Sequence, residues 1–367
     1  MTQSFLDDSY THPHGFIPLE DEYYFTSMPD STITPDSACK PSDTNASHNA
    51  ATPHASSVHN NTCAHNAQFY AFNTAVTINV YADTETAKTA CSHAFEACRA
   101  FEYLFSRTIE SSDISRIHEH APHWTDIHPV TYALLHESIT YCHQSLNTFD
   151  ITMGGVCKLW DFSRKIIPSH DDITCALSHV NIDALELSCN TNTYRARLND
   201  PNARLDVGGT AKGFIADRIG DILLGYGIHH FLINLGGNVL VHGGKPSGAP
   251  FIVGIKNPQD PNHVLMKIPL HSGSVVTSGL YERAFTYKGT RYAHILSPKT
   301  GMPITTDAES VTVIAPKSAD CDGYSTTLCA LGIQKGIAFA QQCPAITCAI
   351  FIDNTNTLYM SNPEALA

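Results

Sequence analysis

Residues 205–219 read LDVGGTAKGFIADRI, in which a carboxylate, two adjacent glycines and a lysine lead into a run with helical spacing. Glycines let a backbone approach a ligand closely, and a helix N-terminus favours an anion. The spacing matches neither a P-loop, whose lysine directly follows the last glycine of GxxxxG, nor the GxGxxG dinucleotide fingerprint. The stretch therefore indicates either an anion-binding turn of another kind or a purely structural turn between a strand and a helix.

The segments on both sides of this turn alternate between strand and helix patterns. Before the turn, residues 69–82 alternate like a strand, and residues 84–106 and 129–148 have helical spacing. After the helical run that follows the turn, short strands and turns succeed one another between residues 229 and 298, and a strand at 309–316 leads into a helix. Helices combined with runs of hairpins predict an α+β fold rather than a doubly wound parallel sheet.

The N-terminal segment differs from the rest in composition. Residues 1–66 are polar, poor in aliphatic side chains and without periodicity, so we expect them to form a disordered tail. The folded domain is then expected to span residues 67–367.

Composition restricts the classes of function. The 367 residues are 43% hydrophobic, which is ample for a core, and 35 acidic against 22 basic residues give a net charge of −13. This charge argues against a non-specific nucleic-acid surface. No apolar run is long enough to span a bilayer, and the start, MTQSFLDDSY, lacks the features of a secretory signal. We therefore expect the chain as written to be cytoplasmic.

Two carboxyl-terminal residues have the chemistry of metal ligands. Asp322 and Thr326 are four residues apart in CDGYSTTL, so a helix would place both oxygens on one face. Hard oxygen ligands suit Mg²⁺ or Ca²⁺ rather than zinc. The alternative is an aspartate that stabilises the helix dipole beside an unrelated threonine.

Three further places could contact a ligand. His294 follows an alternating strand and precedes a proline turn, so it is either a packed residue or a side chain aimed into a cleft. Thr277, Ser278 and Gly279 offer hydroxyls and flexible backbone, although an ordinary strand end explains them equally well. Residues 234–244 predict a hairpin whose turn is Gly236 and Gly237, where a ring or a phosphate could also approach the backbone.

The order of the segments along the chain resembles the FAD:protein FMN transferases, the ApbE-like flavin transferases, from about residue 70 to the C-terminus. The segments that carry the resemblance are FNTAVTINVYA, LFSRTIESSDISRIH, FDITMGGVCKLWDF, LDVGGTAKGFIADRI, INLGGNVLVHGGKP, VGIKNP, VVTSGLYERAFTYKGTRYAHILSPKTGMPI and SVTVIAPKSADCDGYSTTLCALG.

The resemblance implies a fold and a reaction. The fold would be ApbE-like and T-fold-related, with mixed sheets and packed helices. The reaction would be Mg²⁺-dependent transfer of FMN from FAD to a Ser or Thr hydroxyl of an FMN-binding target protein, with release of AMP. FAD hydrolysis to FMN and AMP, and a flavin-binding carrier without turnover, are the alternatives. Members of the family are commonly exported, which makes an extracytoplasmic location the alternative to the cytoplasm.

The resemblance also implies roles for individual residues. His294 would be the catalytic base, and Gly209 (through its carbonyl), Asp322 and Thr326 would bind Mg²⁺, with Ser325 adjacent. The residues expected to contact FAD are Phe72, Thr148, Phe149, Asp150, Asp206, Lys212, Thr277, Ser278, Gly279, His294 and Ile295.

Three positions depart from the family pattern. Ser297 replaces the usual aspartate of His-x-x-Asp-Pro, which removes a carboxylate near the expected site. His118 stands where asparagine is common, and Asn73 where glycine is common. None of the three is an expected metal ligand.

Overall fold

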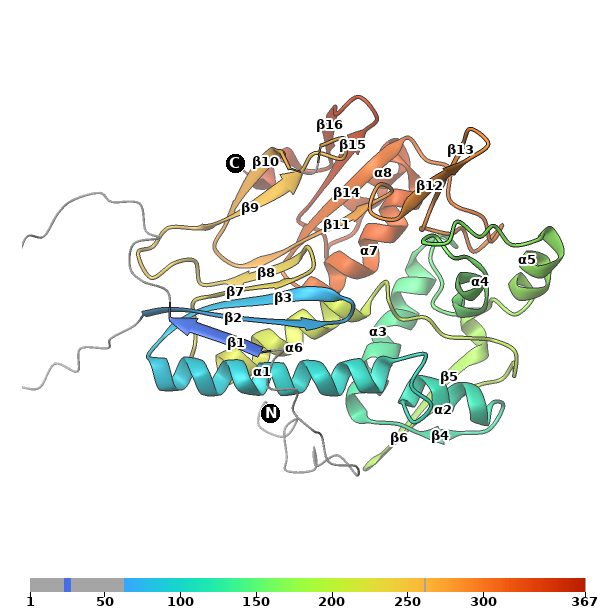
Figure 1. Ribbon diagram of the computed structural model, residues 1–367, viewed down its shortest axis with the longest axis horizontal. Helices are drawn as coiled ribbons and strands as arrows, with labels where there is room; N and C mark the ends of the chain where they lie inside the picture. Colours follow the sequence, from blue (N-terminus) through green and yellow to red (C-terminus); the bar gives the residue numbers. More distant parts are fainter. Residues whose placement is uncertain (1–22, 28–62, 261, 367) are drawn as a thin grey trace, which may run out of the picture.

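The computed structural model describes residues 23–27, 63–260 and 262–366, and its centre is a nine-stranded sheet whose paired strands are all antiparallel (Figure 1). The strand order is β1-β2-β3-β7-β8-β11-β14-β15-β16. The bounds are β1 (Tyr23–Ser27), β2 (Cys63–Ala71), β3 (Thr74–Ala82), β7 (Phe231–Leu235), β8 (Asn238–His242), β11 (Gly273–Gly279), β14 (Ala308–Ala315), β15 (Cys348–Asp353) and β16 (Leu358–Met360).

Helices cover one face of this sheet. They are α1 (Thr84–Phe105), α6 (Ala211–Gly225), α7 (Ser318–Leu331) and α8 (Ile333–Gln342). In α1, the side chain of Asp83 caps the first turn by accepting a hydrogen bond from the Thr86 backbone N–H at 3.0 Å, and buried residues recur every three or four positions as far as Phe105. One core cluster packs α1 and α6 against β2, β3 and β7, and a second packs α7 and α8 against β11, β14 and β15.

The opposite face of the sheet is covered by a separate hairpin. Strands β9 (Phe251–Lys256) and β10 (Val264–Leu270) pair with each other and bury alternate residues against β8, β11, β14 and β15. This alternation matches the period of a half-buried strand.

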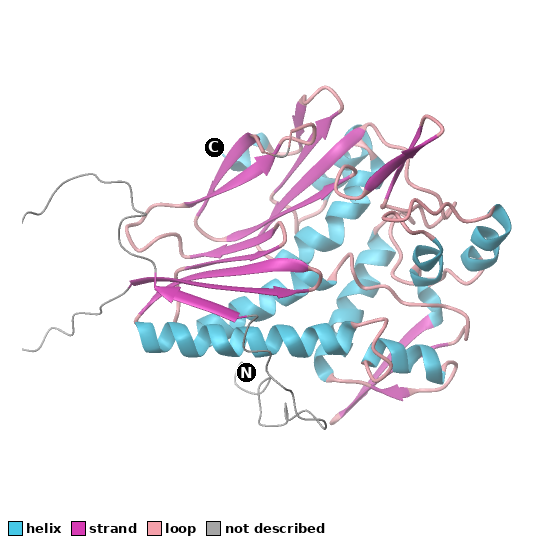
Figure 2. Ribbon diagram, in the orientation of Figure 1, coloured by secondary structure: helices cyan, strands magenta, loops and turns pink. Residues whose placement is uncertain are grey.

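The remaining elements form a layer beside the helices (Figure 2). They are α2 (Asp113–His120), β4 (Thr125–Asp126), α3 (Pro129–Gln144), α4 (Gly154–Leu159), α5 (His170–Leu177), a 3₁₀ turn (Ile182–Ala184), β5 (Leu185–Asn190), β6 (Thr193–Leu198), β12 (Ala284–Tyr287) and β13 (Thr290–Ala293). A last 3₁₀ turn (Pro363–Leu366) contacts β15 instead, and its Leu366 packs against the core under the β9–β10 hairpin. Strands β4, β6 and β5 form a three-stranded sheet, and β12 and β13 form a hairpin. Among the described residues, no helix is long and apolar enough to cross a membrane.

The α+β fold predicted from the sequence is confirmed, and so is the β7–β8 hairpin, whose turn residues Gly236 and Gly237 both have positive φ. The predicted boundary at residue 66 is wrong in two places. Strand β2 already begins at Cys63, and the segment Tyr23–Ser27, assigned to the disordered tail, pairs with β2 as edge strand β1. Both segments are short of aliphatic side chains, so only pairing with distant residues gives them structure. The rest of the predicted tail, residues 1–22 and 28–62, lies outside the described residues.

Candidate active site

The glycine turn ends at the N-terminus of α6. The Asp206 backbone N–H donates to the Ile151 carbonyl at 2.7 Å, and the Thr210 backbone N–H donates to the Val207 carbonyl at 3.0 Å. The glycines provide space: a Cβ at Gly209 would lie 2.8 Å from Cε2 of Phe149, and a Cβ at Gly213 would lie 2.3 Å from the Ser318 carbonyl oxygen. The turn therefore brings the start of α6 against both Phe149 and α7.

This close approach places the Asp322 carboxylate of α7 at the beginning of α6. Asp322 is 5% exposed, its Oδ2 accepts a hydrogen bond from the Gly213 backbone N–H at 3.0 Å, and its Oδ1 is 3.9 Å from Lys212 Nζ. Burial raises the pKa of Asp322, while Lys212 and the backbone N–H groups oppose this rise. Because 3.9 Å exceeds a hydrogen-bond distance, Oδ1 keeps capacity for another ligand.

The predicted metal ligands fit a hard cation. Thr326, half-buried, lies one helical turn beyond Asp322, and Gly209 lies just before the α6 start that Asp322 contacts. A carboxylate, a backbone carbonyl and a hydroxyl are oxygen donors of the kind that Mg²⁺ accepts alongside water and phosphate. Among the described residues, no group of three or more His, Cys, Asp and Glu side chains could hold a metal.

His294 follows β13 directly, and its backbone N–H donates to the Arg283 carbonyl at 3.0 Å. Its Nδ1 is buried and has no hydrogen-bond partner within the described part of the chain. Burial lowers the pKa of His294 to about 4, and the positive charges of Arg283 and Lys212 contribute. The ring is therefore neutral at pH 7 and lies within electrostatic range of Lys212. The next residue, Ile295, is 7% exposed and belongs to the core on the α7 side.

At the end of β11, the hydroxyl of Ser278 lies on the face of the sheet that α7 covers, and the hydroxyl of Thr277 does not. Ser278 Oγ hydrogen-bonds Ser325 Oγ at 2.8 Å, which ties β11 to α7 beside Thr326. Thr277 Oγ1 instead bonds Thr312 Oγ1 at 2.8 Å, on the opposite face of the sheet because neighbouring strand residues alternate. Gly279 is buried, and a Cβ there would lie 2.6 Å from the Tyr281 ring.

Of the predicted residues between 148 and 150, Phe149 packs against the glycine turn at Gly209. It packs against both helical cores and fills the space that the missing Cβ of Gly209 leaves. Thr148 Oγ1 donates to the Ser145 carbonyl at 2.6 Å, and Asp150 Oδ1 accepts from the backbone and the hydroxyl of Thr152, each at 2.7 Å. The side chains of Thr148 and Asp150 thus shape their own loop.

Phe72 occupies the turn between β2 and β3. It has a φ of 54°, its backbone N–H donates to Glu102 Oε1 at 2.8 Å, and its ring packs against the first core. Asn73, where glycine was the expected residue, has a φ of 57°, a left-handed conformation that asparagine tolerates better than most residues.

Sequence reasoning missed Arg107, whose Nη1 lies 2.8 Å from Oδ2 of the predicted FAD contact Asp206. Nothing in the local pattern distinguishes this arginine, since the two residues are 99 positions apart. The structure also gives a role to Ser297, which replaces an aspartate. Its hydroxyl accepts a hydrogen bond from the Lys299 backbone N–H at 3.2 Å, so serine supplies the turn acceptor that an aspartate would supply.

Comparison with known proteins identifies the family of the chain. Residues 72–351 match the family model described as the ApbE family. A protein of Klebsiella pneumoniae (strain 342) named FAD:protein FMN transferase is 32% identical over 283 residues, which cover 75% of this chain and 85% of that protein. A protein of the same name from Treponema pallidum (strain Nichols) is 34% identical over 235 residues, or 60% of this chain and 65% of that protein.

Solved structures give the same answer for the fold. The ApbE protein of Thermotoga maritima superposes with a TM-score of 0.75 at 28% identity, covering 83% of this chain and 98% of that one. The flavin transferase ApbE of Vibrio cholerae superposes with a TM-score of 0.71 at 24% identity, covering 81% of this chain and 96% of that one. From residue 72 to residue 351, and in the arrangement of its sheet and helices, the chain belongs to the ApbE family.

Proposed function

We propose that the protein is an FAD:protein FMN transferase, which moves FMN from FAD to a Ser or Thr hydroxyl of a target flavoprotein and releases AMP. The observation that carries the proposal is the buried Asp322 carboxylate at the N-terminus of α6, with Lys212 Nζ 3.9 Å away. A buried carboxylate beside a lysine and a helix N-terminus suits the binding of a pyrophosphate together with a divalent cation. The names of the similar proteins support the same reaction.

The transfer exchanges one phosphorus–oxygen bond for another. The acceptor oxygen attacks the flavin-side phosphorus of FAD, and the bond from that phosphorus to the bridging oxygen breaks, with its electron pair leaving on AMP. The α6 N-terminus and Lys212 would hold the pyrophosphate in position and offset its charge. Positioning and electrostatics are expected to supply most of the rate increase in phosphoryl transfer.

His294 is suited to accept the proton of the attacking hydroxyl. Its ring is neutral at pH 7 because its pKa is lowered to about 4, and its buried Nδ1 is free of partners among the described residues. Such a ring is a weak base as it stands. A bound pyrophosphate would offset the positive charges of Lys212 and Arg283, raise the pKa of His294 and strengthen the base once substrate is present.

Gly209, Asp322 and Thr326 are the residues that would hold Mg²⁺. When bound there, the ion would polarise phosphoryl oxygens and stabilise charge on the leaving phosphate. Asp322 also has a structural role, because its carboxylate joins α7 to the start of α6 through the Gly213 N–H.

The proposal is tested by incubating the full chain with FAD and Mg²⁺, with and without an FMN-binding domain that carries an exposed Ser or Thr acceptor. We expect the domain to gain the mass of FMN in step with AMP release, and EDTA to abolish both. AMP release without a mass gain would indicate that the protein is an FAD hydrolase and not a transferase. If neither product formed, a flavin-binding carrier without turnover would be the better explanation.

A further inference from the structure

We propose that His118 is a positioning residue, whose neutral ring holds the start of the glycine turn in the conformation that the transfer reaction requires. The inference rests on the proposed function for its catalytic consequence, but its structural basis is independent. The Leu205 backbone N–H donates a hydrogen bond to His118 Nε2 at 2.7 Å, across 87 positions of sequence.

This contact fixes the protonation state of the ring. Nε2 can accept a hydrogen bond only without a proton, so the proton of the neutral ring must be on Nδ1. A second proton would set two N–H groups against each other and break the contact. Burial lowers the pKa of His118 to about 4, and the positive charge of Arg204 adds to the effect. The acceptor is therefore present at neutral pH.

One side of the His118 ring faces a surface cleft. His118 lines a cleft of about 310 Å³ at the surface of α2, together with the charged residues Arg107, Glu110, Glu119 and Arg204 and the hydroxyls of Thr108 and Ser115. Two arginines and two glutamates line this cleft, and of these charges that of Arg204 lowers the pKa of His118.

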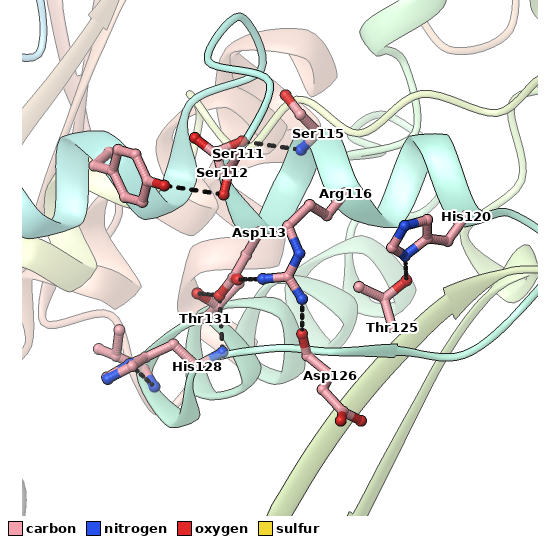
Figure 3. Close-up of polar contacts among 12 residues, drawn as sticks. Ser111, Ser112, Asp113, Ser115, Arg116, His120, Thr125, Asp126, His128 and Thr131 are labelled. Carbon is pink, nitrogen blue, oxygen red and sulfur yellow. Dashed lines mark hydrogen bonds and ion pairs between the residues drawn. The ribbon is translucent and has the colours of Figure 1, made fainter. Parts of the chain in front are cut away.

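The helix that carries His118 is itself held firmly. Asp113, 3% exposed at the start of α2, accepts hydrogen bonds from the His128 backbone N–H at 2.8 Å and from Thr131 Oγ1 at 2.6 Å, and it pairs with Arg116 at 3.0 Å (Figure 3). These contacts join α2 to the beginning of α3. Because α2 is anchored in this way, the His118 ring can hold the Leu205 backbone N–H in place.

The contact acts on the part of the chain that leads into the site. Leu205 is fully buried, and the next residue, Asp206, bonds Arg107 through its carboxylate and Ile151 through its backbone N–H. Helix α6, with Lys212 in its first turn, begins six residues after Leu205. Loss of the acceptor at 118 would leave the buried Leu205 N–H without a partner, and the turn would shift to satisfy it.

Three variants distinguish positioning of the Leu205 backbone by His118 from a general effect of changing α2. His118→Ala removes the acceptor. His118→Asn keeps an acceptor oxygen that does not titrate near neutral pH. His120→Ala, on the same helix, removes the contact of its Nδ1 with Thr125 Oγ1 at 3.2 Å (Figure 3) and leaves the acceptor at position 118 in place.

The direct test is hydrogen exchange of the Leu205 amide in the full chain without ligand, followed by transfer kinetics on the same samples. We expect exchange at least about 10-fold faster in His118→Ala, and a lower kcat with a higher KM for FAD, while His118→Asn and His120→Ala stay within about 3-fold of wild type. Unchanged exchange in His118→Ala would overturn the proposal, as would kinetics in His118→Asn as poor as those in His118→Ala.

A second measurement uses the wild-type protein and does not depend on transfer activity. The ¹⁵N resonances of the His118 ring at pH 7 are expected to show a neutral ring with the proton on Nδ1. A proton on Nε2, or a charged ring, would contradict the contact. Absence of transfer by the wild-type protein would count against the proposed function, while the ring resonances and the exchange rates would still decide the role of His118.

Discussion

At the scale of single residues, His294 combines a neutral ring with a buried Nδ1 that has no hydrogen-bond partner among the described residues. We expect His294→Gln to lower kcat about 100-fold or more, in the usual range for loss of a general base, and to leave the Kd for FAD within a few-fold of wild type. Single-turnover AMP release and FAD titration measure the two quantities. His263→Gln is the control, because His263 is exposed and contacts Asp260 at 2.6 Å. A normal kcat in His294→Gln would remove it as the base.

Asp322 allows a comparison within one helix. Asp322→Asn retains an oxygen for the Gly213 N–H but loses the charge, so we expect a rate at least about 100-fold lower and a much higher Mg²⁺ requirement. Asp320→Asn is the matched control, since Asp320 accepts a hydrogen bond from Tyr141 Oη at 2.9 Å and is not an expected metal ligand. Titration of activity against Mg²⁺ concentration checks both. Equal Mg²⁺ dependence in the two variants would contradict the metal assignment.

Some residues of the site could be predicted from the sequence and others could not, for physical reasons. Asp322 is marked by its spacing from Thr326, and Lys212 by its place beside the glycines at the start of a helix, and the structure brings the two side chains together. Arg107 was missed because its pairing with Asp206 depends on tertiary structure alone. Thr277 was expected for its hydroxyl, but the pleat of β11 turns that hydroxyl to the opposite face from Ser278.

At the scale of elements, the contact between α6 and α7 depends on Gly213. A Cβ at this position would lie 2.3 Å from the Ser318 carbonyl oxygen, so Gly213→Ala would push apart the two helices that carry Lys212 and Asp322. We expect the free energy of unfolding to fall by about 1–3 kcal/mol, with a loss of transfer activity. Urea denaturation measures the change.

The same helix supplies the control for this prediction. A Cβ at Gly225 would meet nothing within 4 Å, and alanine favours helix over glycine, so Gly225→Ala is expected to raise the free energy of unfolding by up to about 1 kcal/mol. If the two variants shifted stability equally, close packing of α6 on α7 would not explain the glycine at 213.

Elements with a clear period were predictable, and short or non-local ones were not. Helices α1 and α3 show helical spacing over 22 and 16 residues, and both were expected. Helices α2 and α4 have only eight and six residues, which is too few for a periodic pattern to stand out. Strand β1 depends on pairing with β2, some forty positions further along the chain, which no local signal indicates.

At the scale of the whole molecule, His118 links the site to the pH dependence of stability. Its pKa is lowered from 6.5 to about 4, so between these values the unfolded chain binds more protons at this position than the folded chain. The contribution of His118 to stability is thus present above pH 6.5 and is lost as pH falls towards 4.

Comparison with a variant isolates this contribution from the other titrating groups. Asparagine does not titrate in this range, so we expect wild type to lose stability relative to His118→Asn as pH falls from 6.5 to 4, with no change in the difference above pH 7. Urea denaturation of both proteins across this range gives the result. A difference that stayed constant with pH would show that His118 is not held neutral by the fold.

The site also depends on how the two helical cores meet. Phe149 packs against both, β11 is tied to α7 through Ser278 and Ser325, and α6 from one core carries the lysine that approaches the aspartate of α7 from the other. The residues therefore converge from segments more than one hundred positions apart. Only a folded domain that contains both cores can assemble them.

The most direct measurement of this account is a crystal structure of the protein with FAD and Mn²⁺, in which anomalous scattering locates the metal. The account predicts the metal among the Gly209 carbonyl, Asp322 and Thr326, with the pyrophosphate over the α6 N-terminus beside Lys212 and within reach of His294. A metal bound elsewhere, or a pyrophosphate remote from Lys212 and Asp322, would contradict it.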